Sequence, residues 1–222
     1  QMCIRDRPKP LVAVRGRPLI EWHLLALARA GVREVVVNVA WRGQQLVDAV
    51  GDGARFGLRV RWSREDLDFG HALETAGGIA RALPMLTERP DDAFWVVSGD
   101  VLAPGFSFDA ARARHFADHE GSLDAHLWLV PNPAWHAQGD FGRGADGMGL
   151  ADGPGPDGQR WTYANLALVR ARLVQGVASG QRAPLGPLLF DAMRRRAVSV
   201  EVMHGEWHNV GTLADLAHAE GR

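Results

Sequence analysis

The chain has 222 residues, enough for one domain with a sizeable core. Its 25 basic and 26 acidic residues give a formal net charge of -1, which lacks the basic excess of a nucleic-acid-binding protein. No apolar run is long enough to cross a bilayer, so we expect neither a nucleic-acid nor a membrane partner. The single cysteine, Cys3, excludes an internal disulfide and favours a reducing, cytoplasmic setting.

The first half of the chain alternates helical and strand-like patterns. Apolar residues at helical spacing predict a helix within 18–31, which Gly31 would end. A β-branched run at 34–39 predicts a strand covered on both faces. A helix at 43–50, a strand at 58–62, a helix at 75–83 and a buried strand at 93–97 follow. This order predicts an α/β, Rossmann-like fold with a mostly parallel sheet flanked by helices.

The second half is less regular. Strands are predicted at 125–130, 161–169 and 198–203, and helices at 184–195 and 212–220. Two stretches rich in Gly, Asp and Pro, 139–149 and 152–158, favour turns, and we interpret both as loops.

Asp100 is the first candidate for chemistry, because it follows the predicted strand at 93–97 behind a glycine. In sheets of this type, ligands bind beyond the carboxyl ends of the strands. Mg²⁺ is usually held by one or two carboxylates together with substrate phosphates. Asp100 is therefore a candidate metal ligand, and a turn or capping role is the structural alternative.

The segment 73–79 places Gly77 and Gly78 at the start of a predicted helix. Adjacent glycines let a ligand approach the backbone, and the N–H groups of a helix start favour polar or anionic ligands. The structural alternative is a tight turn with Thr75 as the N-cap. Lys9, held between two prolines, could present a positioned ammonium to a phosphate or be an ordinary surface lysine.

The segment 207–212, Trp-His-Asn-Val-Gly-Thr, is typical of a strand end, a glycine turn and a helix N-cap at Thr212. By itself it can be purely structural. Serine nucleophile chemistry has no support, because no Gly-x-Ser-x-Gly elbow is present. A dehydrogenase is disfavoured, because no Gly-x-Gly-x-x-Gly follows the first predicted strand.

Together the four segments resemble the sugar-1-phosphate nucleotidyltransferase family. Lys-Pro-Leu at 9–11, Glu-Thr-Ala-Gly-Gly at 74–78, Gly-Asp at 99–100 and the segment 207–212 occur in the family's order, and the likeness covers 8–221. Within the family, the chain is most similar to N-acetylmuramate-1-phosphate uridylyltransferases, on the residues Asn38-x-x-Trp41, Leu73-Glu74-Thr75, Asn132-Pro133 and Gly139-Asp140-Phe141.

This resemblance implies a nucleotide-diphospho-sugar transferase fold and a reaction. The phosphate of a sugar 1-phosphate attacks the α-phosphorus of UTP or GTP, and pyrophosphate leaves. The implied roles are catalysis for Lys9 and Asp100, Mg²⁺ binding for Asp100 and Asn209, nucleotide binding for Asn38, Glu74, Thr75, Gly77 and Gly78, and binding of the sugar phosphate for Asn132, Asp140 and Asn165. A role in peptidoglycan recycling and a monomer or simple dimer are also expected.

Two departures from the family pattern matter. Asn209 stands where many relatives have a second aspartate, so this position supplies no charge to a metal. The family pattern also begins with a strand and a Gly-x-Gly-x-Arg loop, which residues 1–7 do not contain. We expect 1–7 to be a non-native tail and 8–222 to be a single nucleotidyltransferase domain without its first strand, poorly stable and nearly inactive as given.

Two other functions stay open at this point. Mannose-1-phosphate guanylyltransferase is the neighbouring activity in the family. A non-catalytic regulatory or interaction domain of the same fold would suit both Asn209 and the missing loop.

Overall fold

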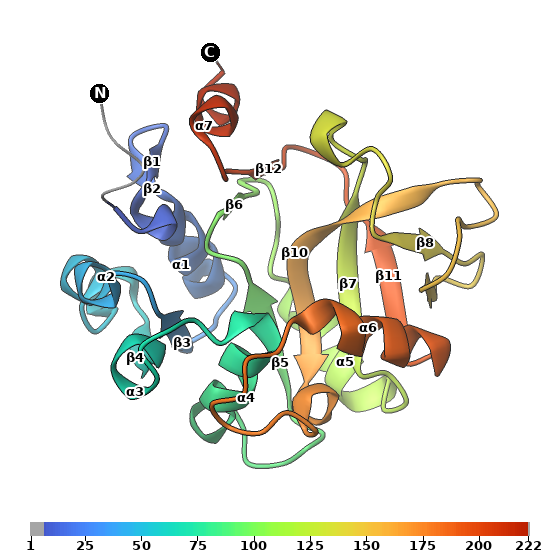
Figure 1. Ribbon diagram of the computed structural model, residues 1–222, viewed down its shortest axis with the longest axis horizontal. Helices are drawn as coiled ribbons and strands as arrows, with labels where there is room; N and C mark the ends of the chain where they lie inside the picture. The colour runs from blue at the N-terminus through green and yellow to red at the C-terminus, as the bar shows by residue number, and fades with distance from the viewer. Residues whose placement is uncertain (1–6, 222) are drawn as a thin grey trace. The chain divides into compact units, whose positions relative to one another are not determined.

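The computed structural model describes residues 7–221 (Figure 1). Cys3 and nearly all of the tail predicted at 1–7 lie outside the described residues. The chain forms two compact units, which we describe one at a time. Unit 1 comprises the described residues of Gln1–Leu73, Ser98–Ala110 and Gly205–Arg222, and unit 2 comprises Glu74–Val97 and Ala111–His204. The single domain expected over 8–222 stays a prediction.

Unit 1 begins with a 3₁₀ turn, η2 (Lys9–Leu11), and an antiparallel hairpin of β1 (Ala13–Val14) and β2 (Arg17–Pro18). Helix α1 (Leu19–Arg29) follows and buries its apolar face through Leu19, Ile20, Leu24 and Leu27. Gly31 takes a φ of 87°, a conformation that glycine adopts without a steric cost, and the helix ends just before it as expected.

A parallel pair forms the middle of unit 1. Strand β3 (Glu34–Val39) pairs with β4 (Arg59–Arg64), and between them come α2 (Gly43–Val50) and η3 (Ala54–Phe56). The short helix α3 (Glu65–Asp68) directly follows β4. The prediction that β3 is covered on both faces is wrong: its valines at 35–37 are only half-buried. β4 is its one partner strand in the described chain, so the other edge of β3 stays unpaired.

The C-terminal segment of the chain packs in the core of unit 1. Strand β6 (Val101–Leu102) pairs antiparallel with β12 (His208–Asn209), and α7 (Leu213–Ala219) follows. Thr212 is the N-cap, as predicted, and forms a capping box with Asp215. A buried cluster of Val14, Leu19, Leu102, Val210 and Ala219 joins the hairpin, α1, β6 and α7.

Unit 2 contains a six-stranded sheet. Its long central strand, β10 (Arg160–Arg170), pairs antiparallel with β5 (Ala93–Val97), β7 (Ala125–Val130) and β8 (Phe141–Arg143). At the two edges, β11 (Val198–Val202) pairs parallel with β7, and β9 (Gly149–Leu150) pairs antiparallel with β8.

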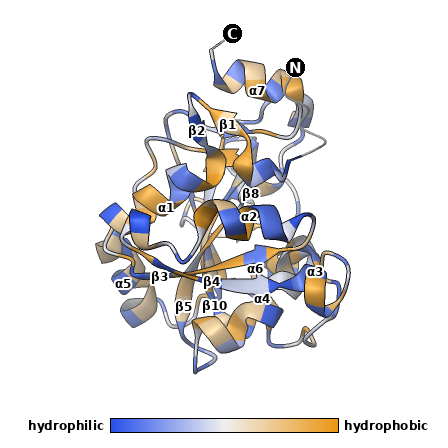
Figure 2. Cartoon of the chain, turned by 90° about the vertical axis from the view of Figure 1, so that its left-hand side faces the viewer, coloured by the Kyte–Doolittle hydropathy of each residue, from blue (hydrophilic) through white to orange (hydrophobic). Residues whose placement is uncertain are grey.

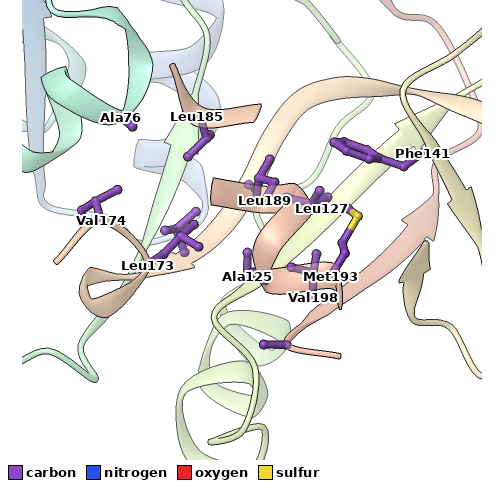
Figure 3. Close-up of a cluster of buried hydrophobic side chains, with 14 of the residues drawn as sticks. Ala76, Ala125, Leu127, Phe141, Leu173, Val174, Leu185, Leu189, Met193 and Val198 are labelled. Atoms are coloured by element: carbon purple, nitrogen blue, oxygen red, sulfur yellow. The ribbon is translucent and has the colours of Figure 1, made fainter. Parts of the chain in front are cut away.

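Helices α4 (Glu74–Leu86) and α6 (Leu185–Arg194) pack on this sheet, with η4 (Ala134–His136), η5 (Ala171–Val174) and α5 (Ala110–His119) in the connections. Figure 3 shows the shared core, in which Leu127 of β7 lies close to Leu189 and Met193 of α6. Alternation along β7 places Leu127 in this core and sends His126 and Trp128 to the other face of the sheet.

The α/β class is confirmed, but the sheets are mixed. Among the described strands only β3–β4 and β7–β11 are parallel, because β10 runs against each of its partners. Strand β5, predicted as buried, is half-buried throughout, and β10 is its one partner strand among the described residues. The helices carry both hydrophilic and hydrophobic residues (Figure 2), and no helix of the described chain is long and apolar enough to cross a membrane.

The predicted loop at 139–149 is also wrong in part, because it contains β8 and β9. Its glycines allow close backbone packing: a Cβ on Gly142 would lie 2.7 Å from the carbonyl oxygen of Gly153. A Cβ on Gly149 would lie 2.8 Å from the Cε of Met193. At Gly142 the neighbours are backbone atoms, so this hairpin requires a glycine there, whereas at Gly149 the neighbour is the flexible end of Met193.

Candidate active site

Unit 1 brings together Lys9 and Asp100, the two residues for which the sequence suggests catalytic roles. Lys9 begins the 3₁₀ turn η2 after Pro8, and its Nζ lies 3.6 Å from Oδ2 of Asp100. The lysine side chain is 49% exposed and the aspartate 27%. An ion pair this open to solvent contributes little to stability. Both groups therefore stay accessible to a charged ligand.

The backbone around Asp100 is fixed from two sides. Its carbonyl oxygen accepts a hydrogen bond of 2.7 Å from the N–H of Val210, and its Oδ1 accepts one of 2.8 Å from the Ser98 hydroxyl. The carbonyl of Val101, the next residue, accepts a bond of 2.8 Å from Nε2 of His23 in α1. Burial lowers the pKa of His23, so the ring is neutral at pH 7 and Nε2 carries its proton.

Gly99 explains why the Gly-Asp and Lys-Pro segments occur together. A Cβ on Gly99 would lie only 2.8 Å from Cγ of Pro10 and 3.4 Å from its Cβ. The two backbones can therefore approach this closely only if position 99 has no side chain. Asp100 directly follows Gly99, and Lys9 directly precedes Pro10. The contact between Gly99 and Pro10 therefore sets the separation of Lys9 and Asp100.

Asn209 lies on β12, opposite Val101 in the ladder and therefore beside Asp100. Its Oδ1 is buried and accepts no hydrogen bond from the described residues. A buried polar atom without a partner is costly and suggests a missing ligand. The Asn209 amide oxygen and the Asp100 carboxylate are oxygen donors of the kind that Mg²⁺ prefers. Within the described part of the chain, no cluster of three or more His, Cys, Asp or Glu residues could hold a metal.

Asn38 does not join this group. It lies near the end of β3 and is exposed, and its Nδ2 donates a hydrogen bond of 2.9 Å to Oε1 of Glu65. The other oxygen of Glu65 accepts a bond of 2.8 Å from the backbone N–H of Leu73. Asn38 is thus part of a network around a buried carboxylate, which the sequence analysis does not single out.

Unit 2 contains the predicted nucleotide segment at the start of α4. Glu74 begins the helix with a φ of 62°, and its side chain pairs with Arg182. The N–H groups of Ala76 and Gly77 both donate to the carbonyl oxygen of Ala183, at 3.0 and 3.1 Å. These two donors, expected to face a ligand, are therefore already paired, whereas the side chain of Thr75 is exposed.

Asn132 and Asp140, the predicted sugar-phosphate contacts, both brace one loop. Nδ2 of Asn132 donates to the carbonyl of Arg160 at 2.9 Å, and its Oδ1 accepts from the Thr162 hydroxyl at 2.9 Å. Oδ2 of Asp140 accepts from the Tyr163 N–H at 2.8 Å, and its Oδ1 lies 3.0 Å from Nε2 of His136. Both side chains thus fasten the loop between β7 and β8 to β10.

Asn165 sits at an irregularity in the middle of β10. The register with β7 shifts between Tyr163 and Ala167, and Asn165 takes a φ of 58°. Asparagine tolerates this left-handed conformation better than most residues, yet it is uncommon inside a strand. Strained backbone of this kind is concentrated at functional sites, which supports the predicted role of Asn165 in substrate binding.

The arrangement in unit 1 suits the transfer of a phosphorylated group. An ammonium can neutralise phosphate charge, and the Asp100 carboxylate with the Asn209 amide oxygen can hold a hard cation. Sequence reasoning missed His23, Ser98 and Glu65, which orient or anchor the predicted residues. None of the three lies in a motif, so only their burial and contacts identify them.

The chain is similar to known proteins over most of its length. The family profile of the MobA-like NTP transferase domain matches residues 4–121. An N-acetylmuramate alpha-1-phosphate uridylyltransferase of Neisseria meningitidis serogroup B is 41% identical over 215 residues, which are 96% of this chain and 88% of that protein. A glucose-1-phosphate thymidylyltransferase of Streptomyces griseus is 27% identical over 216 residues, 94% of this chain and 58% of that protein.

The fold is shared with solved structures as well. A crystal structure of a candidate glucose-1-phosphate thymidylyltransferase from Bacillus anthracis aligns with a TM-score of 0.76 and 15% identity, covering 98% of this chain and 87% of that one. At this identity the likeness concerns the fold alone, which is the nucleotide-diphospho-sugar transferase fold expected from the sequence. The chain therefore belongs to the MobA-like NTP transferase family and is an enzyme of the sugar-phosphate nucleotidyltransferase type.

Proposed function

We propose that this enzyme joins UTP and N-acetylmuramate 1-phosphate to give UDP-N-acetylmuramate and pyrophosphate. The observation that carries the transfer chemistry is the Lys9–Asp100 ion pair. The unpartnered oxygen of Asn209, on the strand that pairs with β6, supports it. The choice of substrates is supported by the Neisseria relative, whose likeness extends over nearly the whole chain. A role in peptidoglycan recycling in the cytoplasm, as a monomer or simple dimer, belongs to the same proposal.

The reaction needs no covalent intermediate on the protein. An oxygen of the sugar phosphate attacks the α-phosphorus of UTP, and the bond from that phosphorus to the β-phosphate oxygen breaks. Positioning and charge neutralisation supply most of the catalysis in such transfers. Lys9 would neutralise charge on the phosphates, because its ammonium is held beside Asp100 yet half exposed.

Asp100 and Asn209 fit a magnesium ion. Asp100 supplies one carboxylate, Asn209 supplies a neutral oxygen, and the phosphates and water would complete the ligand set. Bound Mg²⁺ would neutralise charge on the phosphates during transfer. Ser98 and the N–H of Val210 hold Asp100 so that its carboxylate is already in place.

The test is pyrophosphate release with Mg²⁺ from each pairing of UTP or GTP with N-acetylmuramate 1-phosphate or mannose 1-phosphate. We expect the UTP and N-acetylmuramate 1-phosphate pair to turn over fastest. A preference for GTP and mannose 1-phosphate would replace the proposal with the guanylyltransferase. Folded protein that is silent with every pair would favour a non-catalytic domain.

Two variants make this assay specific. Asp100→Asn should lower turnover by about 10²- to 10³-fold, the usual cost of losing one electrostatic stabiliser of a transition state. The matched control, Glu34→Gln, removes a carboxylate of the same unit that pairs with Arg59 at the surface. It should leave turnover unchanged, because exposed ion pairs of this kind contribute little.

A further inference from the structure

Glu65 is a charged residue in a buried position. It begins α3 directly after β4, and only 4% of its surface is exposed. None of the described lysine, arginine or histidine side chains forms an ion pair with it. Burying a carboxylate without a cation is costly, so its two hydrogen bonds must offset the loss of water.

Those two bonds join segments that are far apart in the sequence. Oε1 accepts from Nδ2 of Asn38 near the end of β3, and Oε2 accepts from the backbone N–H of Leu73. Hydrogen bonds to an ionised acceptor are about twice as strong as neutral ones. Leu73 is also held by its own side chain, which is fully buried. Its backbone and its side chain are therefore both fixed.

Leu73 is the residue before the predicted nucleotide segment. The chain between Glu65 and Leu73 is mostly exposed, and Leu67 shows 71% of its surface. The Glu65–Leu73 bond closes this stretch, and Glu74 then enters α4 in the left-handed conformation. A segment that starts from a fixed residue loses less conformational entropy when a ligand binds to it.

We propose that Glu65 is a positioning residue for the nucleotide: through Leu73 it fixes the start of the segment 74–78, and Asn38 orients its carboxylate. This inference rests on the proposed function, and it changes the role predicted for Asn38. Instead of contacting the nucleotide directly, Asn38 acts through Glu65, because its Nδ2 donates to that carboxylate.

The decisive experiment is a donor–acceptor exchange. Asn38→Asp places two carboxylates 2.9 Å apart, at the distance of the present hydrogen bond, and like charges repel. In the double variant Asn38→Asp/Glu65→Gln, the new amide at position 65 donates to the new carboxylate at position 38, while the amide oxygen accepts from the N–H of Leu73. We expect the single variant to raise KM for UTP about 10- to 100-fold, as for loss of one hydrogen bond to a charged group.

The double variant should bring KM for UTP most of the way back to the wild-type value. In both the single and the double variant, kcat should change less than KM. Amide hydrogen exchange at Leu73 should quicken in Asn38→Asp and slow again in the double variant. Asp66→Asn is the matched control: the neighbouring carboxylate on α3 pairs with Arg64, with both side chains 20% exposed, and KM for UTP should not change. Glu65→Ala, which removes both bonds, should behave as Asn38→Asp does.

Three outcomes separate the possibilities. A KM for UTP that stays high in the double variant would overturn the inference, because Asn38 would then contact the nucleotide directly. Rapid exchange at Leu73 with a wild-type KM in Asn38→Asp would overturn it too, since the network would be structural only. Wild-type protein that neither binds nor uses UTP would overturn the proposed function, and the inference with it.

Discussion

Gly99→Ala tests how closely the catalytic geometry depends on one contact. The new Cβ would lie 2.8 Å from Cγ of Pro10, whereas ordinary carbon–carbon contacts are about 3.5–4.0 Å. The proline ring cannot rotate away, so the backbones at 99 and 10 must separate by roughly 1 Å. A misplacement of about 1 Å costs about 10²-fold in rate, or ~2.7 kcal/mol of transition-state stabilisation.

We therefore expect Gly99→Ala to lower kcat about 100-fold while overpacking destabilises the fold by about 1–3 kcal/mol. Pyrophosphate release at saturating substrates measures the first effect and urea unfolding the second. Gly105→Ala is the control, because a Cβ there meets no heavy atom within 4 Å. Wild-type turnover by Gly99→Ala would refute the idea that this contact sets the position of Lys9 relative to Asp100.

Two further predictions address the metal and the core. Asn209→Asp adds a charged ligand, so half-saturating Mg²⁺ in the pyrophosphate assay should fall about tenfold, and no change would exclude position 209 as a ligand. Burial lowers the pKa of His126 from 6.5 to about 3, so the unfolded state binds its proton first as pH falls. The free energy of unfolding should therefore drop between pH 6.5 and 3 by up to about 1.4 kcal/mol per pH unit. Urea titrations at several pH values measure this slope, and His126→Phe should lack it.

The sequence predicts the regular elements well where one physical signal dominates. The β-branched run of β3, the apolar runs of β5 and β7 and the short helix α2 were predicted with the bounds that the structure shows. Helix α5 was not predicted, because Phe116 is the one fully buried large side chain among its described residues and its surface is otherwise polar. A local sequence pattern also cannot predict whether two strands pair parallel or antiparallel, because the partner strands lie far apart along the chain.

In the candidate site too, some residues can be predicted from the sequence and others cannot. Lys9 and Asp100 could be predicted because each lies in a short motif, and the structure brings them within ion-pair distance. Glu65 could not, because in the sequence it is one charged residue among several in Arg64-Glu65-Asp66. Its burial, and its bond to Leu73 eight residues later, follow only from tertiary packing.

The braced loop between β7 and β8 has a consequence for how its own sequence can vary. Asn132 and Asp140 use their side chains to hold the loop in place, while Trp135 at its tip is 59% exposed and stacks on His136. Exposed positions of this kind usually tolerate replacement within about 0.5 kcal/mol. The loop thus separates the residues that maintain its shape from those that selection can vary. Changes at the tip therefore leave the scaffold beneath it in place.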